Sequence, residues 1–269
     1  MPPDVVLRFF ICVRKGMKSN LKKAQGFIVL CCILVLWEIL VRALKVPLYI
    51  LPAPSAVVTA LVTEFPVLLH HSLVTLYEAL IGVAISLALA LVLGILMDCF
   101  PGMRKTLYPF LVVTQTVPMI VLAPILIIYM GFGLAPKILT VVLMCFFPIC
   151  VSFTDGLGQV GEEYVHLVRA YGAGRLRSYT LVKIPASIPS LLSGLKVSAT
   201  YSITGAVVGE WIGAQEGLGY YLLRVKNSYM LDRVFAAVVL IILLSLGMNG
   251  LISLYAHFRV PYLNRKQRQ

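Results

Sequence analysis

The chain has 269 residues, of which 60% are hydrophobic and 13% are charged. An ordinary soluble domain carries about 25% charged residues, so this composition excludes that class and predicts a polytopic membrane protein. The formal net charge of +12 does not indicate nucleic-acid binding, because the basic residues are spread through short connections instead of gathering on one face with aromatic side chains.

Six apolar stretches are long enough to cross a hydrocarbon core of about 30 Å, which takes roughly 20 helical residues. We expect an all-α membrane domain over residues 26–258, with a basic cytoplasmic segment before it at 1–25 and a basic cytoplasmic tail after it at 259–269. The expected spans lie near residues 26–44, 72–98, 106–130, 135–157, 189–213 and 234–257.

The distribution of Lys and Arg predicts the orientation of these spans. An even number of spans puts both termini on one side, and a cytoplasmic placement of that side gives it the larger share of basic residues. Cytoplasmic loops carry such an excess, so we expect both termini in the cytoplasm. The basic cluster from Arg14 to Lys23 follows the first apolar run where a secretory signal would have its cleavage site, so no such signal is predicted. Lys196 falls within the fifth span or near its start.

The connection between the first two expected spans contains Pro47, Pro52 and Pro54. Proline removes a backbone donor and biases the preceding residue away from helix, so we expect a short extended outer segment. His70 and His71 follow at the outer edge of the second span. Two histidines without further ligands are a weak metal signal. An interfacial role is the alternative, and no metal site is predicted.

The third expected span contains three prolines, with Pro118 in the middle. Each proline frees a backbone carbonyl that lipid cannot satisfy, so we expect this helix to be bent and buried by protein. Gln115, Thr116 and Met119 lie beside the bend. They either line a translocation pathway, or the bend is repaired by nearby hydroxyl groups and has no role in transport.

Three carboxylates, Glu38, Glu78 and Glu210, lie within expected spans. A charge near the bilayer centre costs about 2.5–3.5 kcal/mol on insertion scales, so these side chains must face protein or water. They form a proton relay or cation site, or they are paired or interfacial residues. Glu210 is the best functional candidate because Thr200 and Thr204 share its helix. The alternative is structural, because polar side chains in a helix bundle also form hydrogen bonds between neighbouring helices.

A polar, basic island at residues 160–187 interrupts the apolar sequence. The stretch from Glu162 to Gly174 predicts a short helix with acids in its first turn and Arg169 later, an order that suits the helix dipole. Gly172 can end this helix, and Pro185 stops the hairpin before the next span. The pattern alone is typical either of an amphipathic loop on the membrane surface or of an element bound by a cytosolic partner.

One motif in this island is specific. Arg169-Ala-Tyr-Gly-Ala-Gly-Arg is followed by Val182-Lys-Ile-Pro185, with nine residues between Gly172 and Val182. The motif resembles the cytoplasmic signature of permease subunits of ATP-binding cassette importers, in which a Gly is followed after nine residues by an aliphatic-x-aliphatic-Pro sequence. In that family, the signature forms a coupling helix that docks into a groove of a separate ATPase subunit.

The resemblance implies an ATPase-coupling role for particular residues of this island. The family has Glu-Ala-Ala where this chain has His166-Leu-Val, so Glu162 or Glu163 is expected to supply the acidic contact. The expected coupling residues are Glu162, Glu163, His166, Arg169, Ala170, Tyr171, Gly172, Ala173 and Pro185.

Other stretches are similar to the nitrate, sulfonate, taurine and thiamine-precursor permeases: Tyr49-Ile-Leu-Pro-Ala-Pro-Ser55, Val117-Pro-Met-Ile-Val-Leu-Ala-Pro124 and Gly209-Glu-Trp-Ile-Gly-Ala214. The resemblance implies the MetI-like fold of type I importer permeases, with six transmembrane helices and a cytoplasmic coupling helix, in the plasma membrane. It also implies a homodimer, two ATPase subunits and an extracytoplasmic solute-binding protein. The cargo would be a small organic solute or a nitrate-like anion.

No Gly-Lys pair occurs in the sequence, so the phosphate-binding loop of an ATPase is absent. We therefore expect a non-catalytic subunit without a cofactor of its own, whose partner ATPases bind ATP and Mg. Two other function classes stay open. One is a proton-coupled secondary transporter that uses the intramembrane Glu residues, and the other is an intramembrane enzyme, for which no catalytic constellation is evident. The six cysteines lack zinc or disulfide spacing and are expected to be packing thiols.

Overall fold

The computed structural model describes residues 25, 26 and 28–259. Most of the expected N-terminal segment and of the basic tail lies outside these residues. The described part is helical and contains no strand. After helical residues 28–43 come α2 (Pro54–Thr63), α3 (Phe65–Cys99), α4 (Pro101–Thr114), α5 (Met119–Met130), α6 (Leu134–Gly158), α7 (Glu162–Ala170), α8 (Arg175–Ser178), the π-helical turn η1 (Tyr179–Lys183), α9 (Ile184–Glu210), α10 (Leu218–Asn227) and α11 (Leu231–Arg259).

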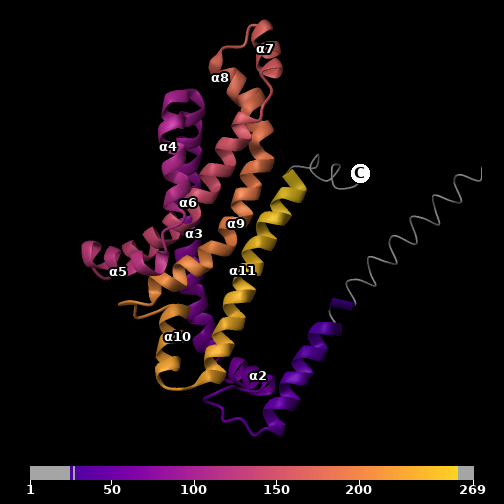
Figure 1. Ribbon diagram of the computed structural model, residues 1–269, viewed down its shortest axis with the longest axis vertical. Helices are drawn as coiled ribbons and strands as arrows, with labels where there is room; N and C mark the ends of the chain where they lie inside the picture. The colour runs from indigo at the N-terminus through magenta and orange to yellow at the C-terminus, as the bar shows by residue number, and fades with distance from the viewer. Residues whose placement is uncertain (1–24, 27, 260–269) are drawn as a thin grey trace, which may run out of the picture.

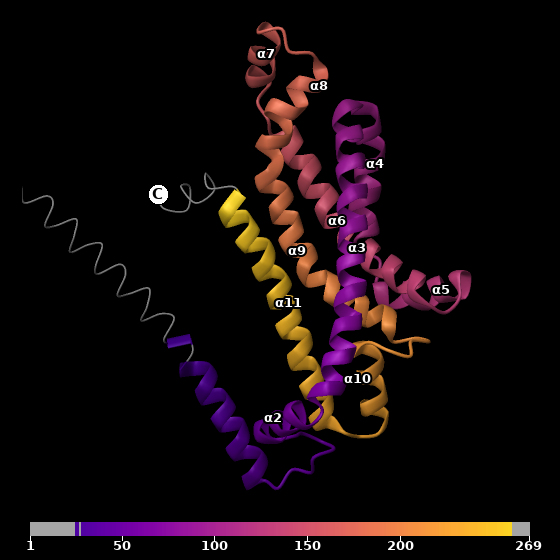
Figure 2. The same cartoon turned by 180° about the vertical axis from the view of Figure 1, so that it is seen from behind.

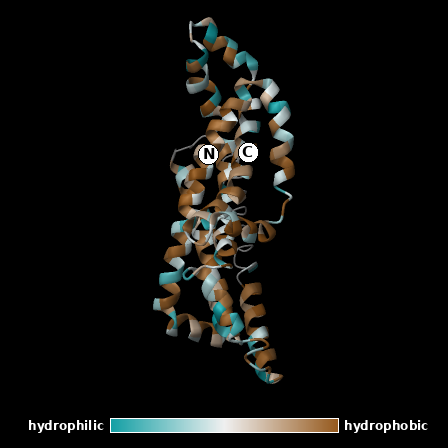
Figure 3. Cartoon of the chain, turned by 90° about the vertical axis from the view of Figure 1, so that its left-hand side faces the viewer, coloured by the Kyte–Doolittle hydropathy of each residue, from teal (hydrophilic) through white to brown (hydrophobic). Residues whose placement is uncertain are grey.

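Four helices of the described chain are long and apolar enough to cross a membrane: α3, α6, the run Arg175–Glu210, and α11 over Leu231–Phe258. They confirm the positions of the second, fourth, fifth and sixth expected spans. Helical residues 28–43 occupy the place of the first expected span, but they fall short of the roughly 20 residues that a crossing needs. The count of six spans therefore stays an expectation. Hydrophobic residues run along most of these helices (Figure 3).

The third expected span differs from the prediction. Instead of one bent helix over 106–130, α4 and α5 are separate helices at an angle of 102°. Pro118 stands between them with ψ 114°, outside the helical range, and it has no N–H to continue the hydrogen bonding of α4. The break is either that of a broken span or that of a re-entrant loop.

The described chain does not by itself supply the burial expected for this region. On α4 and α5, the buried side chains are Leu111, Ala123 and Ile127. Large apolar side chains on both helices are exposed, including Phe110 at 65% and Ile128 at 79%. Figures 1 and 2 show α5 projecting sideways from the long helices. The described chain therefore does not cover these surfaces by itself.

The core centres on α6, which packs extensively against α9 and α3. Glycines make these contacts close. A Cβ added at Gly82 of α3 would lie 2.3 Å from Val141 Cγ1, and one at Gly194 of α9 would lie 2.7 Å from the Pro148 carbonyl oxygen. Small residues let helices approach closely where lipid offers no hydrophobic driving force. This closely packed three-helix core carries α7 and α8 at one end and α2 and α10 at the other (Figures 1 and 2).

Candidate functional site

The hairpin formed by α7, α8 and η1, residues 162–183, extends from one end of the long helices (Figure 1). Its first helix begins with Glu162 and Glu163 and carries Arg169 in its last turn, as the sequence predicts. Gly172 then takes φ 85°, and its N–H donates to the Arg169 carbonyl oxygen at 2.9 Å. A left-handed residue just after a helix is the common way to end it, so Gly172 closes α7.

The expected coupling residues lie mostly on the surface of this hairpin. Those of α7 and its C-terminal turn are exposed from Glu162 to Gly172, with Val165 as the buried anchor and Ala173 half-buried. Exposed apolar side chains accompany them: Tyr171 is 85% exposed and Leu176 is 78% exposed. Pro185 lies on α9, but it lines the same 560 Å³ cavity as Tyr164 of α7. The fold therefore gathers the predicted residues at one end of the molecule.

Contacts that the sequence analysis missed tie the hairpin to α3. Lys183 Nζ lies 2.6 Å from Asp98 Oδ2, and the Tyr179 hydroxyl also donates to this carboxylate. Arg175 donates to the Cys99 carbonyl oxygen at 2.9 Å. The only sequence signal for these contacts is that Asp98 and Lys183 are charged residues at the edges of apolar stretches.

A second pair of contacts joins α4 to α6 at the same end. The Tyr108 hydroxyl donates to Asp155 at about 3.0 Å, and Arg104 lies 3.5 Å from the same carboxylate. A polar cavity of 500 Å³ separates this pair from the hairpin, with Asp98, Arg104, Glu162, His166, Arg169, Arg175 and Lys183 among its lining residues. The hairpin is thus bonded to the end of α3, and a polar cavity remains between the hairpin and the Arg104–Asp155 pair.

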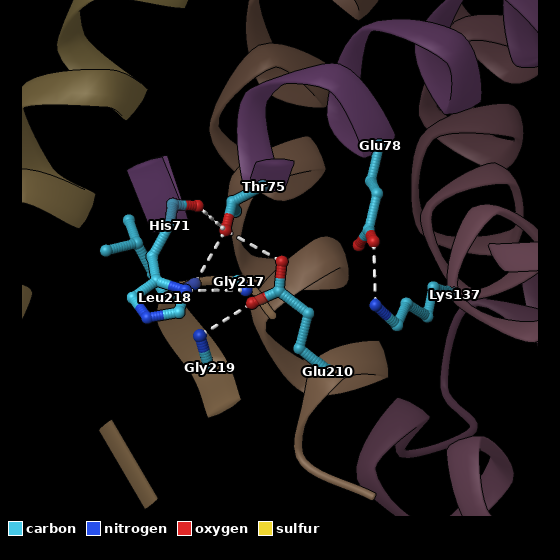
Figure 4. A network of polar contacts seen from close by, with 8 residues as sticks. All are labelled: His71, Thr75, Glu78, Lys137, Glu210, Gly217, Leu218 and Gly219. Atoms are coloured by element: carbon cyan, nitrogen blue, oxygen red, sulfur yellow. Dashed lines mark hydrogen bonds and ion pairs between the residues drawn. The ribbon is translucent and has the colours of Figure 1, made fainter. Parts of the chain in front are cut away.

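At the opposite end of the core, Glu210 holds the start of α10 (Figure 4). Its carboxylate accepts hydrogen bonds from Thr75 Oγ1 at 2.7 Å and from the Gly219 N–H at 2.6 Å. The Gly217 N–H donates to His71 Nδ1 at 3.1 Å. Since a helix N-terminus attracts negative charge, the Glu210 carboxylate suits this place. A Cβ added at Gly217 would lie 2.2 Å from Glu210 Cδ, so the loop fits closely around the carboxylate.

The other two intramembrane carboxylates are also paired. Glu78 is fully buried and lies 2.8 Å from Lys137 Nζ. Glu38 lies 2.5 Å from Arg42 Nε and accepts from the Ser55 N–H at 3.0 Å in the first turn of α2. Of the two alternatives for these residues, the geometry favours paired side chains that hold helices and loops together.

The histidine pair contacts the loop before α10, next to the hydrogen bonds of Glu210. His71 accepts from Gly217, and His70 Nε2 lies 3.6 Å from Glu216. Among residues 25, 26 and 28–259, no group of three or more His, Cys, Asp or Glu side chains is placed to hold a metal ion.

Tyr221 of α10 packs close to this loop. Mainly because it is buried, the pKa of its hydroxyl is raised to about 12, so this hydroxyl stays neutral at physiological pH.

The break between α4 and α5 borders a cavity of 270 Å³. Gln115 and Met119 line it together with Tyr201 of α9. Thr116 instead donates to the Val113 carbonyl oxygen at 2.7 Å, which satisfies a backbone group at the end of α4. Thr116 thus fits the repair alternative, whereas the position of Gln115 and Met119 at the cavity is compatible with the pathway alternative.

The remaining pathway candidates lie on different faces of α9. Thr200 and Thr204 are exposed on one face, whereas Glu210 is 1% exposed and belongs to the network at the α10 end. The structure therefore does not bring Glu210 together with the two threonines. Tyr201, which the sequence analysis did not single out, is the residue that connects α9 to the cavity at the break.

Comparison with known proteins gives a consistent set of relatives. Residues 86–258 match the family described as binding-protein-dependent transport system inner membrane component. A probable ABC transporter permease protein of Haemophilus influenzae is 32% identical over 86% of this chain and 93% of its own length. The formylaminopyrimidine transport permease protein ThiX of Halalkalibacterium halodurans is 34% identical over 86% and 92%.

A solved structure shares the fold. A chain of the MetNI methionine ABC transporter in inward-facing conformations superposes with a TM-score of 0.57 at 18% identity, over 71% of this chain and 97% of that chain. At this identity, the likeness supports the MetI-like all-helical architecture alone.

Proposed function

Since the chain belongs to the binding-protein-dependent inner membrane components and is a permease subunit of an ATP-binding cassette importer, we propose that its α7–η1 hairpin is the element through which ATPase subunits drive transport. The coupling segment would be residues 160–187. The protein is multi-pass in the plasma membrane, and its family works with ATPase and solute-binding partners.

The observation that carries this proposal is the surface of the hairpin. The hairpin extends from the core and is charged. More than three quarters of the surface area of Tyr171, and of Leu176, is exposed. Large exposed side chains of this kind, rimmed by polar residues, are typical of protein interaction sites. The proposed contact set is the one that the family motif implies, from Glu162 to Ala173 with Pro185.

The hairpin also has a path to the membrane helices. Arg175–Glu210 is one helical run, so a force on α8 acts directly on α9. The Asp98–Lys183 ion pair passes the same force to α3. Rigid-body movement of such an assembly is a known class of switching. In this mechanism the chain itself does no chemistry, and the partner ATPases bind ATP and Mg.

We infer a homodimer because one chain leaves the expected pathway incomplete. The apolar surfaces of α4 and α5 and the polar face of α9 with Thr200 and Thr204 are exposed. A second copy can cover the apolar surfaces and supply the other half of the pathway. Two ATPase subunits and one extracytoplasmic binding protein then complete the importer.

Both termini are proposed to be cytoplasmic. The N-terminal end of the first described helix and the C-terminal end of α11 both point toward the α7 end of the molecule (Figures 1 and 2). If α7 meets an ATPase in the cytoplasm, both chain ends lie on that side. The cargo is proposed to be a small organic solute, either a sulfonate-, taurine- or nitrate-like anion or a thiamine-precursor pyrimidine such as the one named for ThiX.

The test is to purify the chain with its partner ATPase and solute-binding protein. Disulfide cross-linking from Tyr171→Cys to single cysteines on the ATPase should succeed, and cross-linking from Leu254→Cys on the exposed face of α11 should fail. Uptake by reconstituted vesicles should require ATP. Uptake by the chain alone, driven by a proton gradient, would refute the proposal in favour of a secondary transporter.

A further inference from the structure

One face of α9 carries polar side chains along the middle of a membrane-spanning helix. Ser193, Lys196, Thr200 and Thr204 are all exposed. They are spaced by three or four residues, so they form a strip on one side of the helix. The opposite side, with Ser198 and Ser202, is fully buried. The strip is therefore the part of α9 that the described chain leaves uncovered.

The exposed face of α11 differs from this strip. Its exposed side chains in the apolar stretch are aliphatic: Val238, Ile242, Leu243, Leu246, Leu251 and Leu254. Such a surface suits lipid, whereas a lysine at a helix centre costs about 2.5–3.5 kcal/mol in hydrocarbon. The α9 strip therefore faces water or protein. Tyr201, which borders it, already lines the cavity at the α4–α5 break.

Lys196 is the charged member of the strip. At a rise of 1.5 Å per residue it lies about 18 Å along the helix from Ile184 and about 21 Å from Glu210, so it lies near the middle of the span. Lys137 and Lys183 each hold a carboxylate, but none of the ion pairs in the described part of the chain includes Lys196. Its positive charge is not neutralised within the described chain.

We propose that Lys196 lines the translocation pathway and gives it a positive potential that favours anionic over cationic cargo. The inference rests on the proposed function, in which α9 forms one wall of the pathway and a second copy the other. Two copies place two lysines in a confined space where charge is screened less than in bulk water. Thr200 and Thr204 add hydroxyl donors along the same face.

The test measures the potential with charged probes on the assembled transporter. Thr200→Cys, in a cysteine-free background, is reacted with an anionic sulfonatoethyl and a cationic trimethylammonioethyl methanethiosulfonate. Position 200 is one helical turn from Lys196, roughly 6 Å away. At that distance, even the dielectric of water predicts that Lys196→Gln lowers the anion-to-cation ratio of reaction rates about tenfold. Lys196→Arg should keep the ratio.

A matched reporter controls for the reagents. At Gln215→Cys, which is exposed in the loop between α9 and α10, Lys196→Gln should leave the ratio unchanged. If Thr200→Cys reacts with neither reagent, its face is not open to water and the proposal is wrong. If both reagents react but Lys196→Gln leaves their ratio unchanged, Lys196 does not set the potential. ATP hydrolysis stimulated by the binding protein is measured on the same assembly, so a failure of the proposed function is seen separately.

Discussion

Removal of Lys183 is expected to loosen the hairpin from α3. The Lys183 and Asp98 side chains are 20% and 6% exposed, and their charged atoms are 2.6 Å apart. An exposed ion pair contributes about 0–1 kcal/mol, whereas removal of one partner from a buried pair costs about 3–5 kcal/mol. The burial here is intermediate, so Lys183→Met should lower the free energy of unfolding by about 2 kcal/mol.

The measurement is a double-mutant cycle with Lys183→Met, Asp98→Asn and both together. Thermal or denaturant unfolding in detergent gives the interaction free energy, and proteoliposomes give the solute taken up per ATP hydrolysed. We expect an interaction of about 2 kcal/mol, equivalent to roughly thirtyfold in an equilibrium constant, and a lower uptake per ATP in each single variant.

The Arg104–Asp155 pair provides the control. It lies at the same end of the molecule, but its charged atoms are 3.5 Å apart and its side chains are 38% and 40% exposed. Arg104→Met should therefore change stability by no more than about 0.5 kcal/mol. The reasoning fails if the effects of Lys183→Met and Asp98→Asn simply add, or if Arg104→Met costs as much as Lys183→Met.

Three further changes test other parts of the structure. Gly172 has φ 85°, so Gly172→Val should strain the backbone by about 1–2 kcal/mol and lower uptake per ATP. Gly174→Ala, at φ −68°, should have a much smaller effect, and equal losses in the two variants would contradict the explanation. Lys137→Met strands the buried Glu78 carboxylate and should cost about 3–5 kcal/mol in thermal unfolding. Much of that loss should return in the Glu78→Gln/Lys137→Met double variant, and a double variant no more stable than the single one would refute the pairing. Glu210→Gln keeps an acceptor for α10 and should reduce ATP-driven uptake only a few-fold, whereas abolition of a proton-coupled uptake by this change would favour the secondary transporter.

The parts of the fold that follow from local patterns were predictable from sequence. Apolar length located α3, α6, α9 and α11, and the spacing around Gly172 located the turn after α7. These features depend on residues that are close together in the chain, so a linear pattern contains them.

The parts that depend on distant residues were not predictable. Thr75 and Glu210 are 135 positions apart, and nothing in either local sequence indicates that they meet. The break at Pro118 was expected as a bend, but its angle depends on what packs against α4 and α5. On α9, Ser202 is buried and Thr200 is exposed, because successive helical residues point in different directions. Only the packed structure shows which side is free.

The helical run from Arg175 to Glu210 has a consequence for how the two faces of the membrane communicate. Its 36 residues follow a bent helical path of about 54 Å at 1.5 Å per residue, and no loop interrupts it. One end continues from the hairpin, and the other end leads into the turn before α10. If the proposed coupling holds, a displacement of the hairpin reaches the opposite membrane surface through one continuous helix.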